Sequence, residues 1–295
     1  MKLMVLDNVG SFSLVPYLRE AKKDWEIFSM ANIANDQMWE IFKKTDPDVV
    51  FCDFCNENAV DLTRRVKDLP RKPKIVIRLH RYEVHSWYMS KIDWSQVTNL
   101  MVVSPKFKEL VKSKKVLLGS QIYVVHNGID MHKFALQDDA AVDNRAVAYV
   151  GYFNQKKGLA LLRTIMASLP ERRFYLAGTY QDPFAQLYME DLELRNAVYC
   201  GWSQTEQFLL GKRFLISTSL TESFGMGIAE AMAMGCTPLV HCWPGAADLW
   251  PTDCLWNSFD ELKSIVAKDP AWCRQWIADR YSMDTCIAKV VSLLG

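Results

Sequence analysis

The segment Thr221–Gly235, TESFGMGIAEAMAMG, decides the fold prediction for the second half of the chain. It follows the apolar run FLISTSL at 214–220 and precedes TPLV at 237–240. Gly235 suits the position just after a helix, which a left-handed glycine often ends. The pattern therefore predicts a strand, a glycine-containing turn, a helix and a second strand. Glu222 is expected on the loop at the carboxyl end of the first strand.

The start of the predicted helix has the features of an anion site. Gly225 and Gly227 leave backbone N–H groups uncovered there, where the helix dipole is positive. Glu222, just before this point, suits a hydroxyl-rich group beyond a phosphate, and Glu230, about one turn into the helix, suits a ribose. Two carboxylates around a phosphate cradle favour a nucleotide sugar as ligand. The alternative is a βαβ unit with two merely solvated glutamates, because this spacing also arises by chance.

The composition indicates a globular protein with room for two domains. The chain has 295 residues, of which 50% are hydrophobic and 23% charged. The net charge of +1 gives no argument for a nucleic-acid partner, and we expect none. No apolar run is long enough to span a membrane, and the N-terminus resembles a first strand more than a signal peptide, so we expect a cytoplasmic protein.

The cysteine content fits the same compartment. We expect the eight cysteines to be reduced thiols. Cys52 and Cys55 form a CxxC at the end of the apolar run DVVFCDFC, without a second CxxC that would favour zinc. We therefore predict core cysteines at these positions.

Short β-branched runs alternate with helical stretches along the whole chain, which is typical of parallel sheets with crossover helices. The polar segment 135–145 interrupts the alternation and is interpreted as a linker. We predict an α/β fold with an N-terminal domain over 1–139 and a C-terminal domain over 140–295, the last helix packing back on the first. Both would be Rossmann-like, doubly wound domains facing a central cleft at their strand carboxyl ends.

The opening segment also resembles a known family. ESFGMGIAEAMAMGCTPLV is similar to the E-x7-E segment of retaining glycosyltransferases with the GT-B fold, especially family 4. The matching positions are Glu222, Phe224, Gly225, Glu230, Ala231, Ala233, Gly235 and Pro238. Three further stretches resemble the family in order and spacing: IYVVHNGIDMHKF at 122–134, VAYVGYFNQKKGLALL at 147–162 and FYLAGT at 174–179.

The resemblance implies roles for the matching residues. Glu222 would accept hydrogen bonds from sugar hydroxyls, and Glu230 would bind the ribose. Lys157 would stabilise the negative charge that develops on the leaving diphosphate. The backbone around Phe224, Gly225 and Met226 would hold sugar and phosphate. Two further glycines match the family's strand ends at the donor site, Gly151 and, beside the base pocket, Gly178.

Two residues of the N-terminal half complete the predicted site. His80 ends the run KIVIRLH, where the family has a histidine that meets the donor sugar. Its alternative is an ordinary hydrogen-bonded histidine at a strand end. Gly10, after the first strand, would let the backbone approach a substrate, although any βα turn can require a glycine.

The sequence departs from the family at one site position. An arginine usually stands five residues before the K-G lysine and also contacts the diphosphate. Tyr152 occupies this position, and Lys156 is not equivalent because an ammonium lacks the bidentate geometry of a guanidinium.

The predicted function is a hexosyltransferase-type glycosyltransferase. The resemblance implies a nucleotide-diphospho-sugar donor, retention of configuration, no metal and no cofactor. The acceptor would be a glycan, a lipid-linked molecule or another compound, and the basic segment 106–115 would allow peripheral contact with a membrane. Two alternatives stay open: another GT-B activity such as a nucleotide-sugar hydrolase or epimerase, and a nucleotide-sugar-binding or scaffold protein with little turnover.

Overall fold

The computed structural model describes residues 1–7, 13–114, 121–190 and 194–295. Its contacts divide the chain into two units. Unit 1 consists of Met1–Gly128 and Met283–Gly295, and unit 2 of Ile129–Ser282. The chain therefore passes between the units twice, and the first unit is built from two separate stretches of sequence.

Unit 1 contains a six-stranded sheet in the order β2-β1-β3-β4-β5-β6, and all its strand pairs are parallel. Its strands are β1 (Lys2–Asp7), β2 (Glu26–Ala31), β3 (Val49–Cys52), β4 (Lys74–Arg78), β5 (Asn99–Val102) and β6 (Gln121–Val124). Its α-helices are α1 (Val15–Ala21), α2 (Asn35–Thr45), α3 (Glu57–Arg65), α4 (Tyr88–Lys91), α5 (Pro105–Ser113) and α12 (Met283–Leu294), and its 3-10 helices are η1 (Val66–Asp68), η2 (Arg81–His85) and η3 (Trp94–Gln96).

Helix α12 contributes to the core of unit 1, although it comes last in the chain. It contacts α1 and β4. Ile287, Val290 and Leu294 belong to the same buried cluster as Val5 and Leu18. Apolar side chains at this helical spacing cover one face of the sheet and leave the opposite face of the helix to solvent.

Unit 2 repeats the arrangement with the strand order β12-β11-β10-β7-β8-β9, again all parallel. Its strands are β7 (Asp143–Val150), β8 (Arg173–Ala177), β9 (Ala197–Gly201), β10 (Lys212–Ser217), β11 (Thr237–His241) and β12 (Leu255–Trp256). Its α-helices are α6 (Leu159–Ser168), α7 (Pro183–Glu190), α8 (Thr205–Leu209), α9 (Met226–Ala233), α10 (Phe259–Ser264) and α11 (Pro270–Tyr281), and its 3-10 helices are η4 (Asp139–Ala141), η5 (Gln155–Lys157), η6 (Ala246–Asp248) and η7 (Thr252–Cys254).

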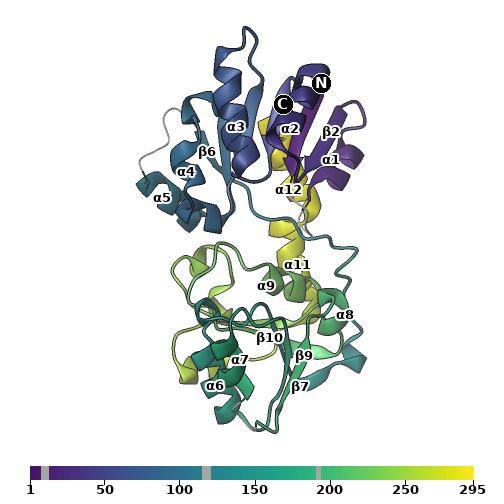
Figure 1. The fold of residues 1–295 in the computed structure, drawn as a ribbon. Coiled ribbons are helices and arrows are strands. Elements are labelled where there is room, and N and C mark those ends of the chain that lie inside the picture. Colours follow the sequence, from purple (N-terminus) through teal and green to yellow (C-terminus); the bar gives the residue numbers. More distant parts are fainter. Residues whose placement is uncertain (8–12, 115–120, 191–193) are drawn as a thin grey trace. The chain divides into compact units, whose positions relative to one another are not determined.

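Figure 1 shows the alternation of strand and helix within each unit. The prediction of two Rossmann-like, parallel α/β units is confirmed. In each sheet the chain builds outward from an internal strand first in one direction and then in the other. The strand order therefore reverses between β1 and β3 in unit 1 and between β7 and β10 in unit 2. Such a reversal opens a space at the carboxyl ends of the strands, where ligands bind in folds of this class.

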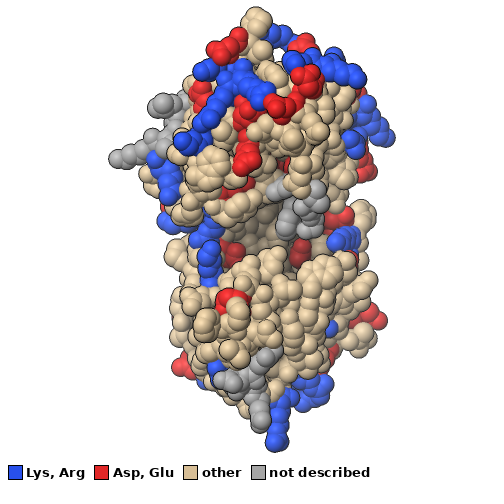
Figure 2. Space-filling model, viewed as in Figure 1, with Lys and Arg blue, Asp and Glu red and all other residues tan. Residues whose placement is uncertain are grey.

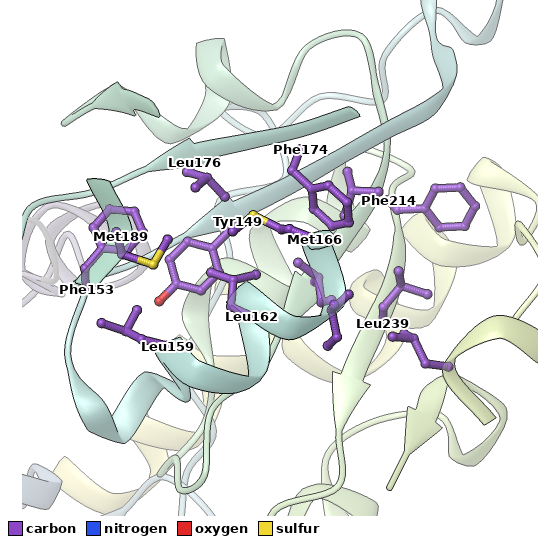
Figure 3. Packing of buried hydrophobic residues seen from close by; sticks show 14 of the residues in the cluster. Tyr149, Phe153, Leu159, Leu162, Met166, Phe174, Leu176, Met189, Phe214 and Leu239 are labelled. Atoms are coloured by element: carbon purple, nitrogen blue, oxygen red, sulfur yellow. The ribbon is translucent and has the colours of Figure 1, made fainter. Parts of the chain in front are cut away.

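The core of unit 2 fixes the start of α6. Leu159 and Leu162 of this helix pack with Tyr149 and Phe153 from the end of β7 and the loop after it (Figure 3). Burying each of these large side chains contributes about 1.5–3 kcal/mol. The turn that immediately precedes α6 is thereby held against the carboxyl end of the sheet.

The cysteine prediction is confirmed for the CxxC pair. Cys52 and Cys55 are both fully buried, and burial raises the pKa of each thiol. All eight cysteines are free thiols. Within the described residues, no group of cysteine, histidine and carboxylate side chains could hold a metal ion.

The surface charge is mixed in sign. Figure 2 shows Lys and Arg interspersed with Asp and Glu over the face of unit 1 that it presents. Arg71, for example, pairs with both Asp46 and Asp48. Among the described residues no helix is long and apolar enough to cross a bilayer.

Candidate active site

The carboxyl edge of the unit 2 sheet brings together Lys157 and Glu222. Lys157 ends η5, the first helical turn after β7, and Glu222 lies in the loop between β10 and α9. The Lys157 ammonium donates a hydrogen bond to Glu222 Oε1, and the two side chains form an ion pair. Ser219 Oγ donates to the same oxygen at 2.9 Å. Both side chains keep part of their surface exposed, so a ligand can reach them.

A side-chain cap orders the turn that carries Lys157, and a hydrogen bond and a close backbone approach join it to the loop that carries Glu222. Asn154 caps η5, its side-chain oxygen accepting from Lys157 N at 3.1 Å. Thr218 Oγ1 donates to the Lys157 carbonyl at 2.7 Å. Gly158 has φ +68°, and a Cβ there would lie 2.1 Å from the Thr218 carbonyl oxygen. Only glycine lets the turn carrying Lys157 approach the loop carrying Glu222 so closely.

The other matching glycines lie at the same edge. A Cβ on Gly178, at the end of β8, would lie 1.8 Å from the carbonyl oxygen of Gly151, at the end of β7. A Cβ on Gly151 would lie 3.8 Å from Lys157 Nζ. These two glycines therefore bring neighbouring strand ends together beside the ammonium.

The loop before α9 presents backbone rather than side chain. Phe224 is buried and packs edge-on against Tyr281, with ring centroids 4.9 Å apart, and against Trp250. Gly225 is the N-cap of α9, and Met226 is its first residue. The first backbone N–H groups of a helix lack partners within the helix, so this end offers donors and a positive dipole to an anion.

Glu230 lies on α9, near the charges of Glu206 on α8 and of Lys133 in a turn. The pKa of its carboxyl is raised to about 7, chiefly by burial; the Lys133 charge opposes this rise and the Glu206 charge adds to it. A carboxyl in this setting is poorly solvated until a ligand supplies hydrogen-bond donors.

The position of the family's arginine is exposed. Tyr152 has 55% of its surface accessible, and its backbone carbonyl accepts from the Tyr149 hydroxyl at 3.1 Å. Lys156 is also exposed. Lys157 is thus the cation of this segment that is held within the strand-end cluster.

His80 lies in unit 1, in a closely packed setting. Its Nε2 is 2.9 Å from the carbonyl oxygen of Asp53, and its ring stacks on Phe54 with centroids 4.2 Å apart. The ring also accepts from the backbone N–H of Glu83. Because Nε2 faces a carbonyl it must donate, so Nδ1 is the accepting nitrogen. Burial, followed by the charge of Arg78, lowers the pKa of His80 to about 4.

Buried charges surround His80. Arg78 and Asp53 form an ion pair at 2.9 Å, and burial raises the pKa of Asp53 to about 6. Glu83 Oε2 accepts from the His80 backbone N–H at 2.7 Å, and burial raises the Glu83 pKa to about 7. Gly10, the other predicted site residue of this half, lies outside the described residues.

Sequence reasoning missed several supporting residues. Asn154 carried a usable signal, because Asn is a preferred N-cap residue at the start of a helical turn. Ser219 and Thr218 carried none, since their roles depend on two loops far apart in sequence. Glu206 and Lys133 were missed for the same reason.

Part of the chain matches a known protein family. Residues 133–250 match the family described as Glycosyl transferases group 1. A GDP-mannose:cellobiosyl-diphosphopolyprenol alpha-mannosyltransferase of Xanthomonas campestris is 26% identical over 210 residues, covering 62% of this chain and 53% of the relative. The chain thus spans about half the length of the curated relatives it matches.

Solved structures share the fold over the whole chain. HepE of Anabaena in complex with UDP superimposes with a TM-score of 0.75 at 15% identity, covering 100% of this chain and 99% of that one. The lipopolysaccharide outer core galactosyltransferase WaaB in its apo form gives 0.75 at 16% identity, covering 99% of both chains. The fold is therefore GT-B.

Proposed function

With residues 133–250 assigned to the glycosyl transferases group 1 family, we propose that this protein transfers a sugar from a nucleotide-diphospho-sugar to an acceptor. The observation that carries the proposal is the pairing of Lys157 with Glu222 at the carboxyl edge of the unit 2 sheet. A cation and a carboxylate side by side suit a ligand that presents a diphosphate next to a sugar.

In this proposal Lys157 acts on the leaving group. As the glycosidic C–O bond breaks, negative charge grows on the diphosphate oxygens. The Lys157 ammonium and the N-terminal N–H groups of α9 would stabilise that charge. The donor diphosphate would have to draw Lys157 away from Glu222, or share it, before the reaction begins.

Glu222 would orient the sugar. The ammonium and the Ser219 hydroxyl both bind its Oε1. Oε2 would then accept from a sugar hydroxyl, while Glu230 would accept from the ribose. The resemblance further implies retention of configuration without a metal, with the leaving phosphate assisting deprotonation of the acceptor.

His80 would contribute packing rather than proton transfer. Both of its ring nitrogens are engaged within unit 1, so a sugar could bind the ring only by displacing the Asp53 carbonyl or the Glu83 N–H. Its low pKa also keeps the ring neutral at physiological pH.

The acceptor is proposed by class. The Xanthomonas relatives are named for a diphosphopolyprenol acceptor, which makes a lipid-linked glycan the first to test. Phe107 and Val111, the apolar side of α5, are buried, so any contact of this helix with an anionic membrane would use its lysines.

The test is a donor panel of UDP-, GDP-, ADP- and dTDP-sugars with purified protein. We expect one donor to raise the Tm and to give nucleoside diphosphate when a polyprenyl-diphosphate glycan is added. Free sugar or an epimer without acceptor would favour a hydrolase or epimerase. A Tm shift with no consumption of donor would favour a binding protein, which the Tyr152 position motivates.

A further inference from the structure

Lys133 and Glu206 form a charge pair beside Glu230. Lys133 Nζ lies 3.5 Å from Glu206 Oε2. Glu206 is on α8, which follows β9 and packs against α9, the helix that carries Glu230. Two helices and the turn that carries Lys133 thus place two carboxylates and one ammonium together at the predicted ribose position.

The pair is incompletely satisfied in the described structure. Glu206 Oε2 is buried and accepts no hydrogen bond from any described residue, since the lysine contact is an ion pair without hydrogen-bond geometry. A buried carboxylate oxygen without a donor is unfavourable. The Lys133 side chain is 48% exposed, so it has room to move when another group approaches.

The nucleoside half of a donor would supply the missing partners. With the ribose hydroxyls on Glu230, the base is the next group of the ligand. Glu206 is near enough to Glu230 for its charge to raise the Glu230 pKa, so it is the carboxylate that a base could reach. The Lys133 ammonium can donate to an acceptor, and the neighbouring Glu206 carboxylate can accept from two donors. Together they fit a base whose hydrogen-bonding edge has one acceptor followed by two donors. Hydrogen bonds to such charged groups are the stronger kind.

Among the common bases, guanine alone has that edge. It presents the O6 acceptor, then the N1–H and 2-amino donors. Uracil and thymine place a single N–H between two carbonyls, one of which would face the carboxylate. Adenine offers one amino group next to an acceptor nitrogen, which the carboxylate would also repel.

We propose that Glu206, with Lys133 beside it, reads the base of the donor and selects guanosine diphospho-sugars. The proposal rests on the proposed function, because it places the nucleoside at Glu230. In binding, Lys133 would turn to guanine O6 while the Glu206 carboxylate accepts from N1–H and the 2-amino group.

The test compares the affinities of GDP, UDP and ADP by calorimetry, since these diphosphates carry the base without the sugar. We expect the wild-type protein to bind GDP more tightly than UDP or ADP. Glu206→Gln should reduce the ratio of GDP to UDP affinity about 10- to 100-fold, the effect of losing a bidentate contact with a base. UDP affinity should stay within about 3-fold. Gln207→Ala, an exposed neighbour on α8, is the matched control and should keep the GDP preference.

A second variant covers the case in which Glu206→Gln fails to fold. Lys133→Met alters an exposed side chain and should weaken GDP more than UDP. A wild type that prefers UDP or ADP, or a GDP preference that survives both variants, would overturn the base assignment and leave the transferase proposal standing. No binding of any nucleoside diphosphate would overturn both.

Discussion

The ammonium of Lys157 and the carboxylate of Glu222, 65 residues apart in the chain, form an ion pair at the carboxyl edge of the unit 2 sheet. Neither charge is left to solvent alone, and each is available to a ligand that replaces its partner. The two charges therefore neutralise each other while they are paired. Each charge becomes available to a donor molecule only when the two side chains separate.

Loss of the Lys157 ammonium should abolish most transfer. We expect Lys157→Ala to lower kcat about 100- to 1,000-fold, as for removal of one group that stabilises transition-state charge. Glu222→Gln should lose comparable activity because it weakens the contact with the sugar. Lys156→Ala, an exposed neighbour, is the control and should retain activity. Circular dichroism should show all three folded, and wild-type rates in the first two would disprove the site.

The close approach at Gly158 gives a stability prediction with an internal control. Gly158 and Gly201 both have φ +68°, but a Cβ on Gly201 would meet nothing within 4 Å. Gly201→Ala should lower the free energy of unfolding by about 1–2 kcal/mol, the cost of the left-handed conformation. Gly158→Ala should cost clearly more, because its Cβ would overlap the Thr218 carbonyl, and it should also displace Lys157. Equal losses in denaturant melts would argue against the close approach.

Glu230 should make stability depend on pH. Burial raises its pKa to about 7, so the folded protein holds this proton more tightly than the unfolded chain does. The resulting stabilisation is complete below the ordinary pKa of about 4.5 and is lost as pH rises through 7. Glu230→Gln should therefore raise the Tm at pH 8, by roughly 2–4 °C for each kcal/mol regained, and change little at pH 4.

A second carboxylate serves as the control of opposite sign. Hydrogen bonds from the Asn257 and Ser258 backbone lower the pKa of Glu261. Its stabilisation is present above the ordinary pKa and is lost as pH falls. Glu261→Gln should therefore lower the Tm at neutral pH. The fall in Tm between pH 5 and 8 that we assign to Glu230 should remain in this variant. A Glu230→Gln melt that parallels wild type across this range would show that Glu230 is already ionised.

His80 should stay neutral throughout the physiological range. Burial and the Arg78 charge lower its pKa to about 4, although the hydrogen bond to the Asp53 carbonyl offsets part of this decrease. Its contribution to stability is present above the ordinary pKa of about 6.5 and is lost as pH falls through 4. Nitrogen NMR, with the signal assigned through a His80→Gln variant, should find the Nε2–H tautomer from pH 8 to 5. Protonation near pH 6.5 would contradict the described hydrogen bonds.

The sequence predicted the features that local pattern controls. The strand, turn and helix around Glu222 follow from apolar runs and glycine positions within one short segment. The buried CxxC pair could be predicted because Cys52 and Cys55 end an apolar run. These features need only neighbouring residues, so the pattern of one sequence suffices to find them.

Features that depend on distant backbone could not be found in the same way. The Lys157–Glu222 pair exists because Gly158 passes close to the Thr218 carbonyl, a contact between strand-end loops that no periodicity encodes. The chemistry of His80 similarly depends on the Asp53 carbonyl, which fixes the tautomer. Motif position alone marked His80 as a candidate and gave no indication that both ring nitrogens are engaged.

The place of α12 has a consequence for synthesis of the chain on the ribosome. Ile287, Val290 and Leu294 complete the core around Val5 and Leu18, so the stretch made first lacks part of its core until α12 has been made. Residues 129–282 close their own sheet before that point. The later-made unit can therefore finish folding first, and a premature stop before residue 283 would leave the earlier-made unit with an uncovered apolar face.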